Sequence, residues 1–273
     1  MRHLLTLLLA ALFLSVACAS SSPPKDWGED VATAHGATEF TPDRVRYLRF
    51  DFVVRKGGVK KAEFRHLLDR VTGAYRYEAD AATFAGVPFL DKETSSWRPI
   101  GLDLPEGRLV ALGNRRERTG RVWIAGQEQP PELAERVRQR IDNDAWWLIL
   151  PQELSAPNLQ VRFDGPTALE GLGEAIELNL TFKAGSGDTP GDVYRIFVDP
   201  GSLRMLRTEI DLQNRDVTLT ADWSEEIVLR GVRFYRERRL PDRTLAFENL
   251  DLPAEVAEGV FTDPGVAMSD GGR

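Results

Sequence analysis

The stretch Ile176-Glu177-Leu178-Asn179-Leu180-Thr181-Phe182 indicates the fold class of this chain more clearly than any other. Every second residue from Ile176 to Phe182 is apolar, and the residues between them are polar. Successive side chains of a β-strand point to opposite faces, so this period of two predicts a strand with one buried and one solvated face. A slip of one residue would turn the whole apolar set to solvent, which specifies the register.

The same alternation recurs along most of the chain. It appears in residues 47–54, 63–68, 75–78, 109–112, 121–125, 145–150, 159–163, 193–198, 203–210, 217–223, 227–236 and 244–250. Turn residues separate several of these runs, as in Asp199-Pro200-Gly201-Ser202, and are typical of antiparallel hairpins. We therefore expect a mainly β protein built as a meander of antiparallel strands.

One segment has the period of a helix instead. Pro130, Pro131 and Glu132 are followed by apolar residues at positions 133, 137 and 141, with arginines toward the end. Proline and an acid at the start and basic residues near the end agree with helix-start chemistry and with the helix dipole. We expect a short helix that faces the sheet. Asp142 and Asp144 are expected in cap or turn positions at its end, rather than as acid–base or calcium-binding carboxylates.

The chain begins like an exported protein. A basic tip precedes an apolar run of 13 residues, from Leu4 to Val16, which is too short to span a bilayer. The sequence Ser15-Val16-Ala17-Cys18 is similar to a bacterial lipobox, in which the cysteine becomes the first residue and is acylated. Acylation would explain why an exported chain has a single cysteine. Ordinary cleavage after Ala17 or Ala19 would instead give a soluble periplasmic or secreted protein.

The mature chain is acidic and has the length of one domain. The full chain has 35 Lys and Arg, of which Arg2 lies in the signal peptide, and 42 Asp and Glu. The mature chain therefore has a net charge of 34 − 42 = −8. This acidity argues against nucleic-acid binding. We expect a signal peptide (1–17), a lipid-anchored flexible tether (18–39), one β domain (40–262) and a disordered tail (263–273).

Few residues are suited to metal or nucleophilic chemistry. Only His35 and His66 remain after removal of the signal peptide, and no cysteine follows Cys18, so a zinc site of His and Cys ligands cannot be assembled. We place His35 in the tether and interpret His66 as a core or rim histidine. No nucleophile-elbow or phosphate-binding glycine pattern occurs, and Ser186 lies in a Gly-Ser-Gly turn. No catalytic residue, metal or cofactor is therefore expected. The arginine-rich stretches 114–121 and 236–243 are interpreted as solvated hairpin ends.

Aromatic residues suggest where a ligand could bind. Alternation through 145–150 predicts a strand in which Trp146 and Trp147 point to opposite faces, so that both faces are covered. Residues 79–107 are too apolar for a solvated loop and are expected to cover the sheet. A curved sheet covered in this way either encloses a cavity for an apolar guest or has a packed core. The candidate lining or cover residues are Trp97, Trp123, Trp146, Trp147, Phe50, Phe52, Leu178, Leu180 and Phe182.

Four blocks of sequence together carry a family resemblance. They are residues 69–76 (Asp-Arg-Val-Thr-Gly-Ala-Tyr-Arg), 120–123 (Gly-Arg-Val-Trp), 141–151 (Ile-Asp-Asn-Asp-Ala-Trp-Trp-Leu-Ile-Leu-Pro) and 189–194 (Thr-Pro-Gly-Asp-Val-Tyr). The chain resembles a family of uncharacterised bacterial envelope lipoproteins that is similar to the lipoprotein-localisation carriers, which have the LolA/LolB-like fold. The resemblance implies a strongly curved open antiparallel sheet, a half-barrel of about eleven strands, with one or two covering helices and a hollow that can hold lipid.

Together these observations predict a non-enzymatic lipoprotein of the bacterial envelope. We expect an acylated Cys18 to hold it in the membrane, at the periplasmic face of the outer membrane, and the half-barrel to bind or carry a lipid or an acylated protein. One alternative is a structural or interaction module with a filled core that binds an unknown envelope protein. A second is a carboxylate-based hydrolase, which would need two converging acidic groups that the sequence does not show.

Overall fold

The computed structural model describes residues 25–86, 89–91, 96–98, 103–183, 192–212 and 218–268, with the backbone alone for 89–91 and 96–98. The expected signal peptide, Cys18 and Ser186 lie outside the described residues.

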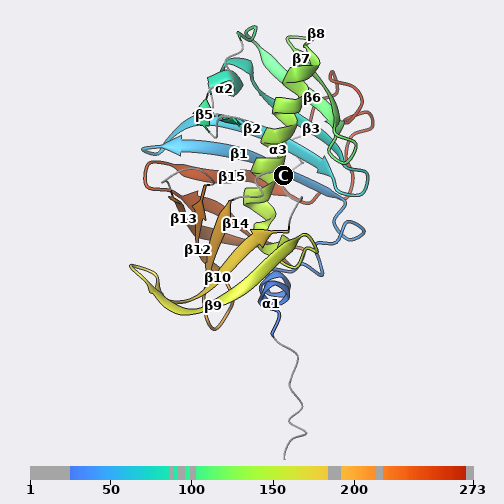
Figure 1. The fold of residues 1–273 in the computed structure, drawn as a ribbon. Helices are drawn as coiled ribbons and strands as arrows, with labels where there is room; N and C mark the ends of the chain where they lie inside the picture. The colour runs from blue at the N-terminus through green and yellow to red at the C-terminus, as the bar shows by residue number, and fades with distance from the viewer. Residues whose placement is uncertain are drawn as a thin grey trace, which may run out of the picture.

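One antiparallel sheet of 13 strands dominates the structure, and it is not closed into a barrel (Figure 1). Its strands, in spatial order, are β8 (Gln127–Glu128), β7 (Thr119–Ile124), β6 (Arg108–Asn114), β3 (Ala74–Asp80), β2 (Val59–Asp69), β1 (Tyr47–Lys56), β15 (Thr244–Asp251), β14 (Val232–Arg239), β13 (Thr218–Leu229), β12 (Met205–Asp211), β11 (Val193–Val198), β10 (Gly173–Phe182) and β9 (Leu159–Leu169). A separate pair is formed by β4 (Phe89–Asp91) and β5 (Ser96–Arg98). Because β1 pairs with β15, the ends of the sheet are β8 and β9.

This architecture confirms the predicted fold class, a mainly β protein with an open, curved antiparallel sheet. Every predicted run except 145–150 overlaps a strand of the sheet. The run 227–236 spans the end of β13, a turn and the start of β14, so one predicted strand is two. Among the described residues the sheet has 13 strands, where about eleven were expected, and three helices accompany it, where one or two were expected.

Helix α3 (Pro131–Glu153) lies across the inner, concave face of the sheet (Figure 1). The inner face is fixed by register, since Phe50 of β1 is paired with His66 of β2 and both side chains are fully buried. From α3, the guanidinium of Arg140 lies 4.9 Å from the ring centroid of Phe52. The helix therefore fills this half of the concave side.

The strand expected at residues 145–150 is wrong, because these residues belong to α3. The helix does not end near Asp142 but continues through Pro151 to Glu153. A short, uninterrupted apolar run has no period that separates a buried helix from a buried strand, so the sequence pattern was ambiguous here. Trp146 and Trp147 are thus not on opposite faces of a strand; they lie about 100° apart around a helix.

The range expected to be a flexible tether contains a helix, α1 (Trp27–Ala34). Its Val31 is fully buried in the main core cluster. His35 was also expected in the tether but is buried, with Nδ1 2.7 Å from the carbonyl of Val31 and Nε2 3.0 Å from the hydroxyl of Tyr235. The folded domain therefore begins at or before Trp27 rather than at residue 40.

The end of the chain departs from expectation in the same way. Residues 263–268, expected in a disordered tail, belong to a segment that covers the outer face of the sheet; we call residues 253–268 the C-terminal strap. Met268 of the strap is 4% exposed and lies in a small apolar cluster with Val260. Arg76 of β3 donates from Nη1 to the carbonyls of Val260 and Asp263, at 3.1 and 3.0 Å. A buried guanidinium thus fixes the strap to the sheet.

Candidate functional site

Three aromatic side chains meet at the rim of the sheet where β10 ends and β11 begins. The ring centroid of Trp146, on α3, lies 5.6 Å from that of Phe182 and 6.1 Å from that of Tyr194. The rings of Phe182 and Tyr194 are 6.0 Å apart and nearly perpendicular. Trp146 and Phe182 are partly exposed, whereas Tyr194 is buried. We call these three residues the rim aromatic cluster; such edge-to-face contacts are favourable beyond the area that they bury.

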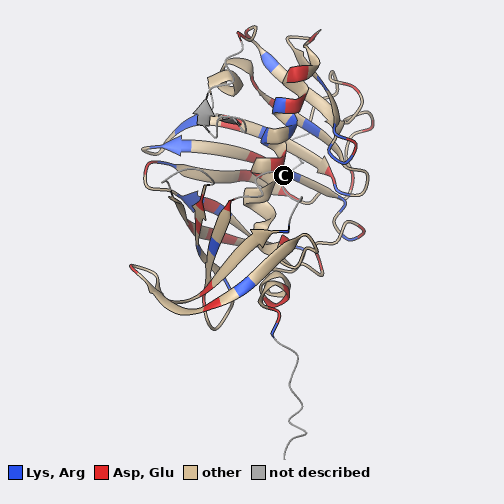
Figure 2. Cartoon of the chain, in the orientation of Figure 1, with Lys and Arg blue, Asp and Glu red and all other residues tan. Residues whose placement is uncertain are grey.

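Two different periods bring the cluster together. The period of two along β10 puts Phe182 on the same face as Leu178 and Leu180, which are both fully buried beneath α3. The helical period of α3 supplies Trp146 from residues 145–151, a segment without charged side chains, and Figure 2 shows tan turns in the lower part of the helix. The sequence predicted Phe182 and Trp146 as ligand contacts, and the structure brings them into one cluster.

The indole of Trp146 has an unsatisfied polar group. Its Nε1 is buried and has no hydrogen-bond partner among the described residues. A buried N–H without an acceptor destabilises the structure by about 1–3 kcal/mol. An oxygen atom supplied by a bound molecule at this position would therefore be favourable, and the adjoining rings offer it apolar surface.

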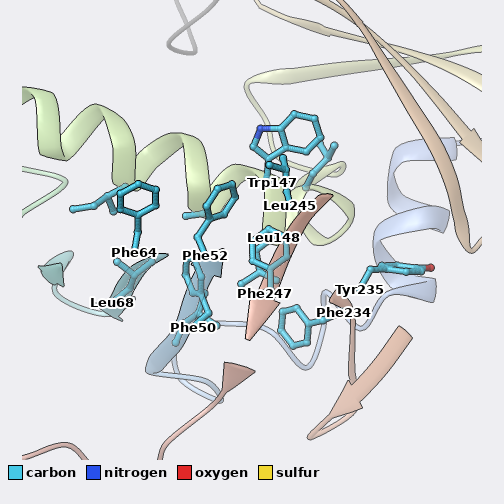
Figure 3. Close-up of a cluster of buried hydrophobic side chains, with 14 of the residues drawn as sticks. Phe50, Phe52, Phe64, Leu68, Trp147, Leu148, Phe234, Tyr235, Leu245 and Phe247 are labelled. Carbon is cyan, nitrogen blue, oxygen red and sulfur yellow. The ribbon is translucent and has the colours of Figure 1, made fainter. Parts of the chain in front are cut away.

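The inner face away from the rim is filled by side chains. Figure 3 shows Phe50, Phe52 and Phe247 grouped beneath α3, with Trp147 on the helix beside them. The ring centroids of Phe52 and Phe247 are 5.4 Å apart, and the four side chains are at most 7% exposed. Phe50 and Phe52, predicted as candidate lining, are thus core residues of a packed region.

Arg238 of β14 is a buried residue that the sequence analysis missed, since its arginine-rich stretch was interpreted as solvated. Its side chain is fully buried, and its guanidinium lies 3.3 Å from the ring centroid of Trp223. Its Nη2 donates to the carbonyl of Trp147 at 2.6 Å, and its Nη1 to the carbonyl of Tyr235 at 2.9 Å. In a regular α-helix the Trp147 carbonyl would accept a hydrogen bond from the backbone N–H of residue 151, but residue 151 is a proline and has no N–H. Arg238 therefore replaces a missing helix bond, and burial lowers its pKa well below the usual value.

A second buried polar contact joins α3 to the sheet. Nε2 of His66 lies 3.2 Å from Oδ2 of Asp144, and neither side chain is exposed. Arg140 donates to the same carboxylate oxygen at 2.8 Å. Burial lowers the pKa of His66 despite the opposing effect of Asp144, so the imidazole is neutral near pH 7. His66 is a core residue, as predicted, stacked 4.4 Å from the ring of Phe50.

The cap or turn positions expected for Asp142 and Asp144 are wrong, because both residues lie well inside α3. Asp142 accepts from Arg115 at 2.7 Å, which ties the helix to the turn between β6 and β7. Both carboxylates thus have structural partners. Among the described residues, no group of three or more His, Cys, Asp and Glu could hold a metal ion.

One predicted site residue, Trp123, does not reach the rim. Trp123 of β7 follows Val122, which is buried on the inner face, so its indole is on the outer face, where Arg121 lies 4.9 Å from its ring centroid. Trp97 lies in β5, and its side chain is outside the described residues. Of the expected cover, α2 (Ala81–Gly86) places Phe84 against Tyr77.

The outer face has a polar pocket. It has a volume of about 630 Å³ beside β2, β3 and β6, and charged residues of both signs line it, including Lys61, Glu63, Asp80 and Arg108. Its chemistry differs from that of the rim aromatic cluster.

None of the helices among the described residues combines the length and the apolar composition that a membrane span requires.

Comparison with known proteins gives a similarity of fold. No family model matches, and no curated protein matches. A DUF1329 family protein from Desulfovibrio piger is 14% identical, with a TM-score of 0.42 over 86% of this chain and 95% of the other. A LolA superfamily protein from Nitrosomonas europaea is 9% identical, with a TM-score of 0.48 over 86% and 97%. A putative outer membrane lipoprotein-sorting domain from Vibrio parahaemolyticus is 8% identical, with a TM-score of 0.40 over 79% and 88%.

These matches are similarities of fold, and at such identities and TM-scores no role and no functional residue carries over from them to this chain.

Proposed function

We propose that this chain is a non-enzymatic lipoprotein of the bacterial cell envelope that binds an apolar ligand at the rim aromatic cluster. The observation that carries the proposal is the partly exposed pair Trp146 and Phe182, in which the indole N–H of Trp146 has no acceptor among the described residues. Aromatic surface with one unpaired polar group is the usual composition of a site for a mainly apolar molecule. An acyl chain with an ester or carboxyl oxygen has the matching chemistry.

The ligand class follows from the surroundings of the cluster. Residues 145–151 of α3, which include Trp146, carry no charge, and the side chains on the same face of β10 as Phe182 are Leu178 and Leu180. A strongly charged ligand would lose hydration there without gaining a partner. A lipid or the acyl group of an acylated protein is the better match.

The location follows from the start of the chain. A basic tip, an apolar run and Cys18 in a lipobox-like sequence support export and acylation. Each buried methylene contributes about 0.8 kcal/mol, so several acyl chains would hold the protein on a bilayer. We place it at the periplasmic face of the outer membrane, where lipids and acylated proteins are available as ligands.

The packing of α3 favours a second candidate function. Beneath the helix, Phe50 and Phe52 are buried in a filled region, which suits a rigid module that binds an envelope protein on its outer surface. The two candidates differ in one measurable respect, since only the first requires a ligand at the rim.

The test is binding of cis-parinaric acid, a fluorescent fatty acid, to the purified mature protein. We expect saturable binding that is weakened at least about tenfold in Phe182→Ala, since losing the contact of a Phe ring removes roughly 1.5–3 kcal/mol. Trp146→Phe should also weaken binding. Trp123→Phe on the outer face is the matched control and should bind like the original chain.

Native mass spectrometry of protein extracted from membranes provides an independent check. Co-purified lipid supports the ligand-binding proposal. A bare mass in repeated preparations, together with equal cis-parinaric acid binding by Phe182→Ala and the original chain, would refute it and favour the interaction module.

A further inference from the structure

We propose that Trp27 and Phe163 form a contact with the bilayer surface and so seat the folded domain on the membrane that holds its anchor. This inference rests on the proposed acylation of Cys18. It adds the surface through which the domain itself meets the lipid, which the anchor alone does not define.

The two rings form a stack in which Phe163 is exposed and Trp27 is half-buried. Trp27 is the first residue of α1 and Phe163 lies in the edge strand β9; their ring centroids are 4.9 Å apart and their planes differ by 10°. Phe163 is 44% exposed, although it is a large apolar residue. Figure 1 shows α1 beside β9, the last strand at one end of the sheet. The exposed ring of Phe163 therefore presents aromatic surface outward from this end.

The length of the chain before α1 limits where this surface can be. Lys25, the first described residue, follows Cys18 by seven residues. Seven residues span at most about 25 Å even when fully extended. An acylated Cys18 would thus keep the Trp27–Phe163 stack near the lipid at a high effective concentration, so that even a weak surface affinity would be realised.

The local charges define the kind of lipid contact. Nζ of Lys25 lies 3.2 Å from Asp30, and Nη2 of Arg162 lies 2.7 Å from Asp164. Both cations are paired with carboxylates, and Nζ of Lys25 also lies 3.6 Å from the ring centroid of Trp27. We therefore expect apolar contact, rather than attraction to anionic headgroups, to drive binding. Trp and Phe favour the interface between headgroups and acyl chains through their apolar rings. The contact should therefore form on zwitterionic phosphatidylcholine and change little with salt.

The test uses the acylated full-length product in phosphatidylcholine vesicles. The chain has a single cysteine, and acylation blocks its thiol, so one introduced cysteine can be labelled selectively. An environment-sensitive fluorophore at Arg162→Cys should be quenched by lipids that carry a nitroxide near the headgroup. The same label at Val59→Cys, an exposed apolar position in the other half of the sheet, is the control and should not be quenched.

Removal of the stack should release the domain from the surface. In Arg162→Cys carrying Phe163→Ser as well, we expect quenching to fall at least fivefold while the intact mass still shows the acyl groups. Equal quenching at positions 162 and 59, or no change with Phe163→Ser, would overturn the inference even if the anchor is present. A mass without acyl groups would instead contradict the proposed anchor, so the two failures are distinguishable.

Discussion

The replacement of a helix hydrogen bond by Arg238 can be tested by a double-mutant cycle with Pro151. In Arg238→Met the carbonyls of Trp147 and Tyr235 lose their donors. A buried carbonyl without a donor destabilises the fold by about 1–3 kcal/mol, and removing a buried cation recovers part of this. We expect the free energy of unfolding to fall by about 2–4 kcal/mol.

Pro151→Ala supplies the missing N–H to the Trp147 carbonyl. In the Pro151→Ala background the Trp147 carbonyl keeps a donor when Arg238 is lost. Arg238→Met should therefore be less destabilising there than in the original chain, by about 1–2 kcal/mol. The measurement is urea unfolding followed by circular dichroism on the four proteins of the cycle. Arg239→Met, at a neighbouring exposed position, should change stability by less than about 0.5 kcal/mol. Equal effects of Arg238→Met in the original chain and in the Pro151→Ala background would refute the assignment.

Three further predictions concern stability. Burial lowers the pKa of His35 from 6.5 to about 4, so the folded state binds fewer protons than the unfolded state between these pH values. The free energy of unfolding should therefore fall by up to about 3 kcal/mol as the pH drops from 6.5 to 4. Urea unfolding at a series of pH values measures this fall, which should be smaller in His35→Gln. Arg76→Met should free the C-terminal strap, seen as faster proteolytic cleavage within residues 253–268, whereas an unchanged cleavage pattern would contradict its role. Gly36→Ala places a Cβ 2.4 Å from the carbonyl oxygen of Gly231 at a φ of +77°. The free energy of unfolding should therefore fall by at least about 1 kcal/mol. An unchanged urea midpoint would show that the turn adapts.

The strands were predictable because their chemistry is local. In β10 the polarity of each side chain matches the face on which it lies, so the period of two between Ile176 and Phe182 was sufficient to predict the strand. The predicted short helix was correct at its start, where Pro131 and an acid mark the first turn. Residues such as Phe182 were placed on the inner face for the same local reason.

The remainder depends on contacts between distant parts of the chain. The burial of His35 requires Tyr235, 200 residues away, and nothing in the sequence around His35 indicates that partner. The burial of Arg238 requires a helix that contains Pro151, whereas the alternation predicted a strand at residues 145–150. Local sequence patterns therefore predict solvent exposure for polar residues that are in fact buried against partners distant in the sequence.

The polar contacts of α3 also determine how a ligand could enter. Two buried contacts fix the helix to the sheet, one between Asp144 and His66 and one between the Trp147 carbonyl and Arg238. Breaking buried charged contacts of this kind costs several kcal/mol, so displacement of the whole helix would be rare at 25 °C. Ligand exchange should instead occur at the rim, with α3 in place. Hydrogen exchange of the amides in residues 145–150 should therefore stay slow when cis-parinaric acid is added, and faster exchange there would show that the helix moves to admit the ligand.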